Sequence, residues 1–220
     1  MKNNISKLLI AGSFFCAFGF GSANAFNGHA QQGGLVVPLS IVQASDKAAD
    51  AKAESFIDTM ASDAIGFLGD ASLSDAAKQK RFRSLLTRSF DINTIGRFAL
   101  GRYWRSFSKE QRDEYLSLFR EMIVEVYARR FSEYDGQKLE VRSSRRENEK
   151  DVIVSSVIAD ASGGQEIKVD WRLRNKGGKY RVIDVIVEGV SMALTQRSDF
   201  SSVIQRGGGN ASVLLDHLRG

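Results

Sequence analysis

Groups that usually carry catalysis or bind metals are scarce in this sequence of 220 residues. It contains one cysteine, Cys16, and two histidines, His29 and His217. Neither histidine has a second histidine or a cysteine at the spacing that zinc sites use, so we expect no metal centre. The sequence has no Gly-x-Ser-x-Gly segment, no strand-linked Gly-x-Gly-x-x-Gly and no Walker motif, which disfavours serine hydrolases and nucleotide-dependent enzymes. We therefore expect no enzyme and no cofactor.

The first 25 residues have the three-part pattern of a cleaved export signal. Residues 1–7 carry two lysines and no acid, Leu8–Gly21 is an apolar run of 14 residues, and Ala23-Asn24-Ala25 supplies small residues at the cleavage site. A 14-residue helix is about 21 Å long, which is too short for a hydrocarbon core of roughly 30 Å. An uncleaved anchor is thus the weaker alternative. We predict cleavage after Ala25 and a mature protein in the periplasm.

The mature chain would contain residues 26–220 and, without the two leader lysines and Cys16, would carry a net charge of +3 and no cysteine. The missing cysteine excludes disulfides and thiolate chemistry there. So small a charge gives little support to nucleic acid as a partner, and we expect none. No further apolar run reaches 18 residues, which argues against a membrane span. We predict a loosely ordered lead-in at 26–44 and one domain at 45–220.

Apolar residues at helical spacing dominate the first half of that domain. The pattern predicts helices from Ser45 or Asp46 to Gly69, over about 75–89, and between Asp91 and Gly101. A fourth helix should begin at the capping box Ser108-Lys109-Glu110-Gln111 and end near Gly136. One face of it is unusually aromatic. Such a face most often packs into a core, and lining a ligand pocket is the less frequent use.

After residue 136 the period changes from 3.6 to 2, which predicts strands at 137–146, 151–160, 165–175 and 179–188. The short links between them require antiparallel neighbours. Helices should follow from Val190 to about Gln205 and from Asn210. This order is typical of an α+β fold, with helices packed on one face of a twisted four-stranded antiparallel sheet.

Three segments carry a resemblance to a known family: FALGRYWR at 98–105, VDWRL at 169–173 and VIDVIVEGVSM at 182–192. In combination they resemble the toluene-tolerance family of periplasmic phospholipid-binding proteins, over about residues 45–220. The resemblance implies a lipid pocket between helices and sheet. It also implies two partners, an inner-membrane ABC transporter complex with a lipid-binding subunit and an outer-membrane lipoprotein–porin complex. A hopanoid-associated subfamily has a similar pattern, so the resemblance leaves the choice between phospholipid and hopanoid cargo open.

A lipid carrier also agrees with the physical chemistry of the sequence. A diacyl lipid exposes about thirty methylenes, and each costs about 0.8 kcal/mol in water. A carrier must therefore enclose the chains in an apolar lining and needs no reactive groups. Two other classes stay open at this point: an isomerase-like enzyme with an apolar pocket and an Asp–Tyr pair, and an adaptor that binds only proteins.

The predicted lining comes from three sets of residues that share a face. Ile167, Val169 and Trp171 alternate on one strand, and Phe119, Ile123 and Tyr127 follow one stripe of the fourth helix. We expect Val185, Val187 and Met192 to border the same space. The alternative is that these side chains touch with no gap between them.

Arginines are the candidate contacts to a partner or to the lipid head, because they pair well with carboxylates and phosphates. Nine arginines occur in residues 102–146, around the fourth helix and the first strand, and seven of them are the candidates: Arg102, Arg105, Arg129, Arg130, Arg142, Arg145 and Arg146. From this set we predict Arg142, Arg145 and Arg146 as the partner-binding residues. Scattered solvated charge is the alternative.

Overall fold

The computed structural model describes residues 40–159 and 166–220, with side chains from residue 51 onward. The predicted export signal, its cleavage site and residues 26–39 of the predicted lead-in lie outside the described residues. Within the described ranges, no helix combines the length and the apolar character that a membrane crossing requires.

One antiparallel sheet organises the domain, with strands in the order β1-β2-β3-β4-β5. The strands are β1 (Lys138–Arg146), β2 (Asp151–Ala159), β3 (Ile167–Lys176), β4 (Lys179–Val187) and β5 (Val190–Ser191). Val169 and Leu173 are buried on one face of β3 while Lys168 is exposed on the other, as the alternation predicts. The α+β prediction is confirmed.

The fifth strand was not predicted, because two residues carry no periodicity. Glu188 and Gly189 have φ angles of 49° and 81°, in the left-handed region, and they reverse the chain after β4. Val190 and Ser191 then pair with Val187 and Ile186. The following helix therefore begins at Met192 rather than at Val190.

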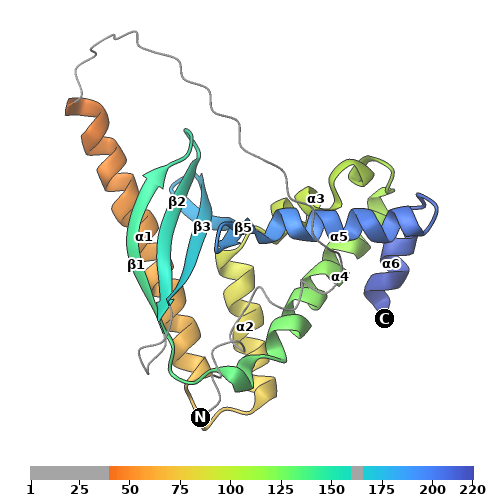
Figure 1. The fold of residues 1–220 in the computed structure, drawn as a ribbon, viewed down its shortest axis with the longest axis horizontal. Helices are drawn as coiled ribbons and strands as arrows, with labels where there is room; N and C mark the ends of the chain where they lie inside the picture. The colour runs from red at the N-terminus through yellow and green to blue at the C-terminus, as the bar shows by residue number, and fades with distance from the viewer. Residues whose placement is uncertain (1–39, 160–165) are drawn as a thin grey trace, which may run out of the picture.

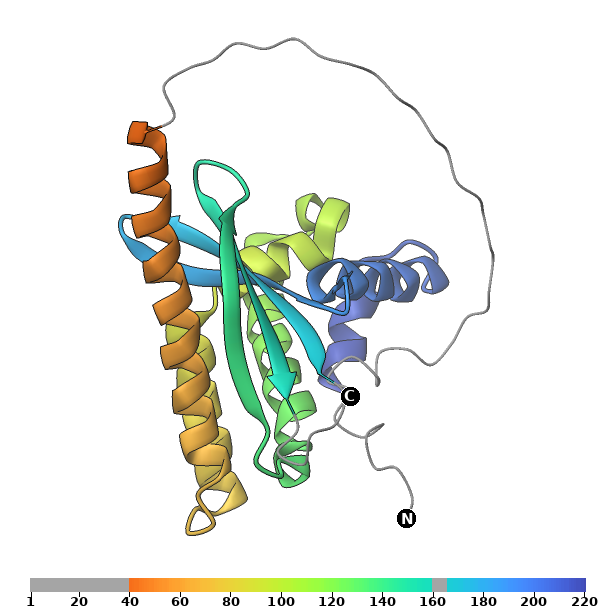
Figure 2. The ribbon, with the colours of Figure 1, turned by 60° about the vertical axis from the view of Figure 1, so that its left-hand side comes forward.

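Six α-helices and two 3-10 turns complete the described chain. They are α1 (Ser40–Leu68), α2 (Asp75–Ser89), α3 (Ile92–Leu100), η2 (Gly101–Arg105), α4 (Lys109–Ala128), η3 (Phe131–Glu133), α5 (Met192–Arg206) and α6 (Ser212–Arg219). Figure 1 shows the sheet with the long helix α1 on one side of the molecule and α3, α5 and α6 gathered on the other, while Figure 2 shows α1 lying along the sheet.

The predicted helix boundaries hold best where a side chain caps the helix. Ser108 Oγ accepts a hydrogen bond from the Gln111 amide at 3.2 Å, and Gln111 Oε1 accepts one from the Ser108 amide at 2.9 Å. The capping box at the start of α4 is confirmed. Asp91 likewise caps α3 by accepting from the Thr94 amide at 3.0 Å.

The start of α1 and the end of α4 also differ from the predictions. α1 begins at Ser40, five residues before Ser45, because no proline or glycine interrupts residues 40–45. α4 ends at Ala128 rather than near Gly136. The chain then turns through η3, which buries the Phe131 ring against Phe82 with centroids 5.3 Å apart. Phe131 thus stays on the inner side although the α-helix has ended.

The buried residues form two separate cores. One core joins α3, α4, α5 and α6, with Tyr115, Phe119 and Phe200 at its centre. The other joins α1 and α2 to the inner face of the sheet through residues such as Ile57 and Leu173. Phe90, in the link between α2 and α3, packs against both cores. The region between the two cores is where the interior is not filled.

Candidate functional site

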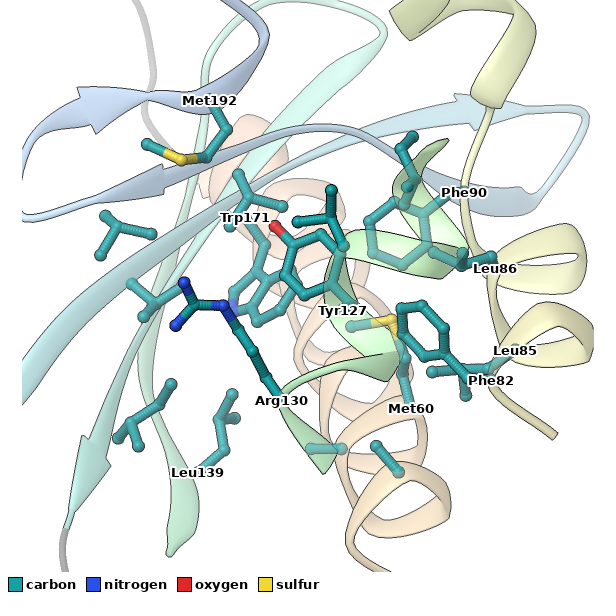
Figure 3. A pocket seen from close by; sticks show the side chains of 18 of the residues that line it. Met60, Phe82, Leu85, Leu86, Phe90, Tyr127, Arg130, Leu139, Trp171 and Met192 are labelled. Carbon is teal, nitrogen blue, oxygen red and sulfur yellow. The ribbon is translucent and has the colours of Figure 1, made fainter. Parts of the chain in front are cut away.

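An apolar cavity of about 370 Å³ lies between the inner face of the sheet and helices α1, α2, α4 and α5. In Figure 3 the labelled side chains of Met60, Phe82, Leu85, Leu86, Phe90, Tyr127, Leu139, Trp171 and Met192 surround it. Nearly all groups that face the space are carbon, so it offers little to a polar ligand and much to hydrocarbon. The volume is within the range of small-molecule sites, about 300–1,000 Å³.

The sheet forms one wall of the cavity. Ile167, Val169 and Trp171 alternate along β3 and all line the space. In the register of the sheet, Trp171 lies opposite Val185 of β4, and Val169 lies opposite Val187. Cross-strand neighbours project from the same face, so these side chains make one continuous apolar surface.

Two hydrogen bonds fix the Trp171 ring in that wall. Its Nε1 donates to Ser156 Oγ at 2.9 Å, and Ser156 Oγ donates to the carbonyl oxygen of Val169 at 2.9 Å. Ser156 is itself buried. The one polar atom of the indole is therefore satisfied within the sheet, and the apolar part of the ring is left to face the cavity.

Helix α4 forms the opposite wall. Phe119, Ile123 and Tyr127 recur every four residues and lie on one stripe that lines the space. The Tyr127 ring packs against Phe82 of α2 with centroids 5.9 Å apart. Burial raises the pKa of the Tyr127 hydroxyl, against a smaller opposite effect of Arg130. The hydroxyl is therefore neutral at physiological pH.

The structure brings all nine predicted lining residues to one cavity. Six come from β3 and α4, and Val185, Val187 and Met192 complete the border. They surround an open space rather than packing against each other with no gap.

Part of the lining was missed from the sequence. Met60, Ala64 and Phe67 of α1 and Phe82 and Leu85 of α2 also face the cavity. Helical periodicity identifies these positions as inward. Periodicity does not distinguish a face that packs against other side chains from a face that lines a cavity. The sequence therefore predicts these five residues as ordinary core.

Polar residues gather at the end of the cavity where α4 passes into β1. Arg130, Glu133, Gln137 and Lys138 line it there, and Arg130 Nη1 lies 3.6 Å from Glu133 Oε2. Glu133 and Lys138 are exposed. The cavity therefore reaches solvent at this end, which we call the α4–β1 end.

The only aspartate that lines the cavity, among residues with described side chains, is engaged in holding a helix. Asp184 accepts hydrogen bonds from Ser191 Oγ at 2.6 Å and from the Ala193 amide at 3.0 Å. These bonds fix the start of α5 next to β4. No cluster of metal-binding side chains occurs in the parts of the chain that the structure describes.

The seven arginines named from the sequence are distributed over three elements: η2, the end of α4 and β1. Arg142, Arg145 and Arg146 all belong to β1, at one edge of the sheet. Arg142 pairs with Glu140 at 3.1 Å and Glu166 at 3.0 Å, and Arg145 pairs with Glu147 at 2.9 Å. The side chains of Arg142 and Arg145 are 51% and 65% exposed, so both stay accessible to a partner.

Comparison with known proteins agrees with this architecture. A family model described as MlaC protein matches residues 58–220. The chain belongs to the MlaC family. Among curated members, an intermembrane phospholipid transport system binding protein from Haemophilus influenzae is 33% identical over 105 residues, 46% of this chain and 49% of that protein. The toluene tolerance protein ttg2D of Pseudomonas putida is 25% identical over 119 residues, 54% of this chain and 55% of that protein.

The matched regions thus span about half the length of these curated MlaC-family relatives. A solved structure with the same fold extends further. It is a phospholipid-binding protein from Ralstonia solanacearum, in complex with a phospholipid. It has a TM-score of 0.65 and 22% identity, over 76% of this chain and 94% of that one.

Proposed function

We propose that this chain is a periplasmic phospholipid carrier, which holds the acyl chains in the cavity between the sheet and the helices. The observation that carries the proposal is that cavity, with a nearly all-carbon lining on both walls and an opening to solvent at the α4–β1 end. The relatives described as phospholipid transport and phospholipid-binding proteins support the same assignment.

The energetics explain why a carrier needs such a cavity. Exposing about thirty methylenes to water costs on the order of 24 kcal/mol, at about 0.8 kcal/mol each. A lipid therefore does not cross an aqueous compartment unaided at a useful rate. Apolar walls remove this cost for the acyl chains. The charged head group must stay outside them, because burying a phosphate that has no partner is costly.

We assign the chain no catalytic role. Among the described residues that line the cavity there is no histidine, the Asp184 carboxylate accepts from Ser191 Oγ and from the Ala193 amide, and the Tyr127 hydroxyl is neutral. Movement of lipid in one direction would draw its energy from a partner. We propose the inner-membrane ABC transporter complex with its lipid-binding subunit and the outer-membrane lipoprotein–porin complex as the two docking partners.

Lipid transfer to an acceptor distinguishes a carrier from an enzyme and from an adaptor. Purified protein loaded with labelled phospholipid is mixed with an empty lipid-binding subunit of the transporter. A carrier transfers about one lipid per chain and leaves it chemically unchanged. Hydrolysed or isomerised lipid over many turnovers would contradict the proposal in favour of an enzyme, and failure to load any lipid would favour an adaptor.

A further inference from the structure

A second recess, of about 380 Å³, lies on the surface beside the first cavity. It is formed by the α2–α3 link, by α4 and by the turn between β3 and β4. Two of its residues, Phe90 and Ile92, also line the first cavity. The others are Thr87, Asp91, Asn93, Arg120, Lys176, Lys179 and Arg181. Phe90 and Ile92 thus form an apolar partition between a hydrocarbon-lined space and a cationic one.

The charges of the recess are strongly unbalanced. Four cations line it against a single carboxylate, Asp91, which gives a net charge of +3. That carboxylate is already engaged, because it accepts from Lys176 Nζ at 2.6 Å and from the Thr94 amide. Burial opposes ionisation of Asp91, but these hydrogen bonds together hold its pKa below the ordinary value. Asp91 therefore cannot neutralise the remaining cations.

The register of the sheet places like charges directly opposite each other. Lys176 pairs across the turn with Lys179, and Arg174 pairs with Arg181. Facing like charges destabilise a sheet. Arg174 and Lys176 each have an aspartate partner, Asp151 and Asp91 respectively.

Lys179 and Arg181, which lie opposite Lys176 and Arg174, have no aspartate partner among the residues that the structure describes. Arg181 donates to the carbonyl oxygen of Arg88. Among the described side chains, no carboxylate forms an ion pair with Arg120, Lys179 or Arg181. A bound anion would relieve their mutual repulsion.

We propose that this recess binds the phosphate group of the lipid whose acyl chains occupy the cavity. The inference rests on the proposed carrier function. A phospholipid joins a phosphate to hydrocarbon within a few bonds, and the partition at Phe90 and Ile92 joins the matching surfaces. Phe90 is half-buried and packs against both cores. Under this proposal, a rotation of the Phe90 ring out of the partition would connect the two spaces.

The α4–β1 end is the competing place for the head group. It offers Arg130 and Lys138 with Glu133, a net charge of +1. The recess offers +3 and lies beside the start of α3, where Asn93 is in the first turn. The recess is therefore the stronger phosphate site of the two.

A spin-labelled lipid locates the head group directly. The full chain is loaded with a phosphatidyl lipid that carries a nitroxide on its head group. The amide NMR signals of the protein are then compared before and after the nitroxide is reduced. We expect the nitroxide to broaden the amide signals of Thr87 and Asn93. Broadening confined to Gln137 and Lys138 would overturn the inference while leaving the carrier function intact.

A charge-matched pair of variants gives a second test. Arg120→Gln/Lys179→Gln/Arg181→Gln removes the three cations that lack a carboxylate partner. Lys52→Gln/Lys80→Gln/Arg206→Gln removes three exposed cations elsewhere. The recess variant should release labelled lipid about tenfold faster, which corresponds to about 1.4 kcal/mol, and the control should not. Equal release rates would contradict the proposal.

Inorganic phosphate distinguishes the two possible sources of the anion, which are the lipid head group and free phosphate. Added to lipid-free chain, it should shift the Thr87 and Asn93 amides and compete with the head group. If the chain takes up no lipid but phosphate still shifts these amides, the carrier function fails and the recess is a site for free phosphate. If neither ligand perturbs Thr87 or Asn93, the recess is no phosphate site.

Discussion

Trp171 and Ser156 lie on neighbouring strands with the indole Nε1 2.9 Å from the serine Oγ, and that hydroxyl donates onward to the Val169 carbonyl at 2.9 Å. One buried hydroxyl therefore satisfies two groups and fixes the largest ring in the cavity wall. Without it the indole N–H would be left without a partner beside hydrocarbon, which costs about 1–3 kcal/mol.

Removing that hydroxyl should loosen the wall. We expect Ser156→Ala to lower the free energy of unfolding by about 1–3 kcal/mol and to change the Trp171 fluorescence, measured by denaturant titration. Ser155→Ala on the opposite face of β2 is the matched control and should change stability by less than about 0.5 kcal/mol. Equal effects of the two substitutions would mean that the Ser156 hydroxyl has no special role.

A charge placed in the sheet wall should empty the cavity. Val169 is 3% exposed and faces the space, so the carboxylate of Val169→Glu would bring water among the acyl chains. We expect the variant to fold, because its side chain can occupy the cavity, and to co-purify with at least about tenfold less lipid.

Ser143→Glu is the control for that experiment, since it adds the same charge at an exposed position of β1. Circular dichroism checks folding of both variants. If Val169→Glu folds and keeps its normal lipid content, the lining is assigned wrongly.

The β1 arginines should act on delivery rather than on lipid retention. Exposed ion pairs such as Arg142–Glu166 contribute about 0–1 kcal/mol, so they can exchange for an acidic partner at little cost. Replacing Arg142, Arg145 and Arg146 together with Ser should slow transfer to an acceptor several-fold at low salt, and the difference should shrink as salt rises. Transfer rates that match the unmodified chain at both salt levels would remove these residues from the docking surface.

The Asp151–Arg174 pair should make stability depend on acid pH. Arg174 donates to both carboxylate oxygens of Asp151, at 2.7 and 2.8 Å, and these hydrogen bonds lower the Asp151 pKa despite the opposing effect of burial. A lowered folded-state pKa gives a contribution that is present above the unfolded pKa, about 4, and is lost as pH falls through the folded value.

Comparison with Asp151→Asn isolates this contribution. At pH 7 the unmodified chain should be more stable by about 1–3 kcal/mol, and the difference should diminish below about pH 4. Denaturant midpoints between pH 7 and pH 2 measure it. A difference that stays constant over this range would show that ionisation of Asp151 does not stabilise the fold.

Much of the fold could be predicted because its signals are local. Ser108 and Gln111 mark the start of α4 through a capping box, and the alternation along β3 identifies the face that carries Val169 and Trp171. The same periodicities led to six of the nine lining residues, since a continuous apolar stripe on α4 and on β3 is visible in the sequence itself.

The remaining features depend on contacts that no local pattern encodes. β5 has two residues and is defined by the reversal at Glu188 and Gly189. The end of α4 is concealed because Phe131 stays buried after the helix stops. The basic recess joins Arg120 to Lys179, 59 positions apart in the sequence, and only the folded arrangement brings them together.

Extraction and mass spectrometry of the lipid that co-purifies with the full chain show whether the protein carries a phospholipid. We expect about one intact phospholipid per chain, released only when the protein is denatured or an acceptor is added. A purified chain that carries no lipid and takes up none from phospholipid vesicles would contradict this expectation, and so would a chain that carries only a hopanoid.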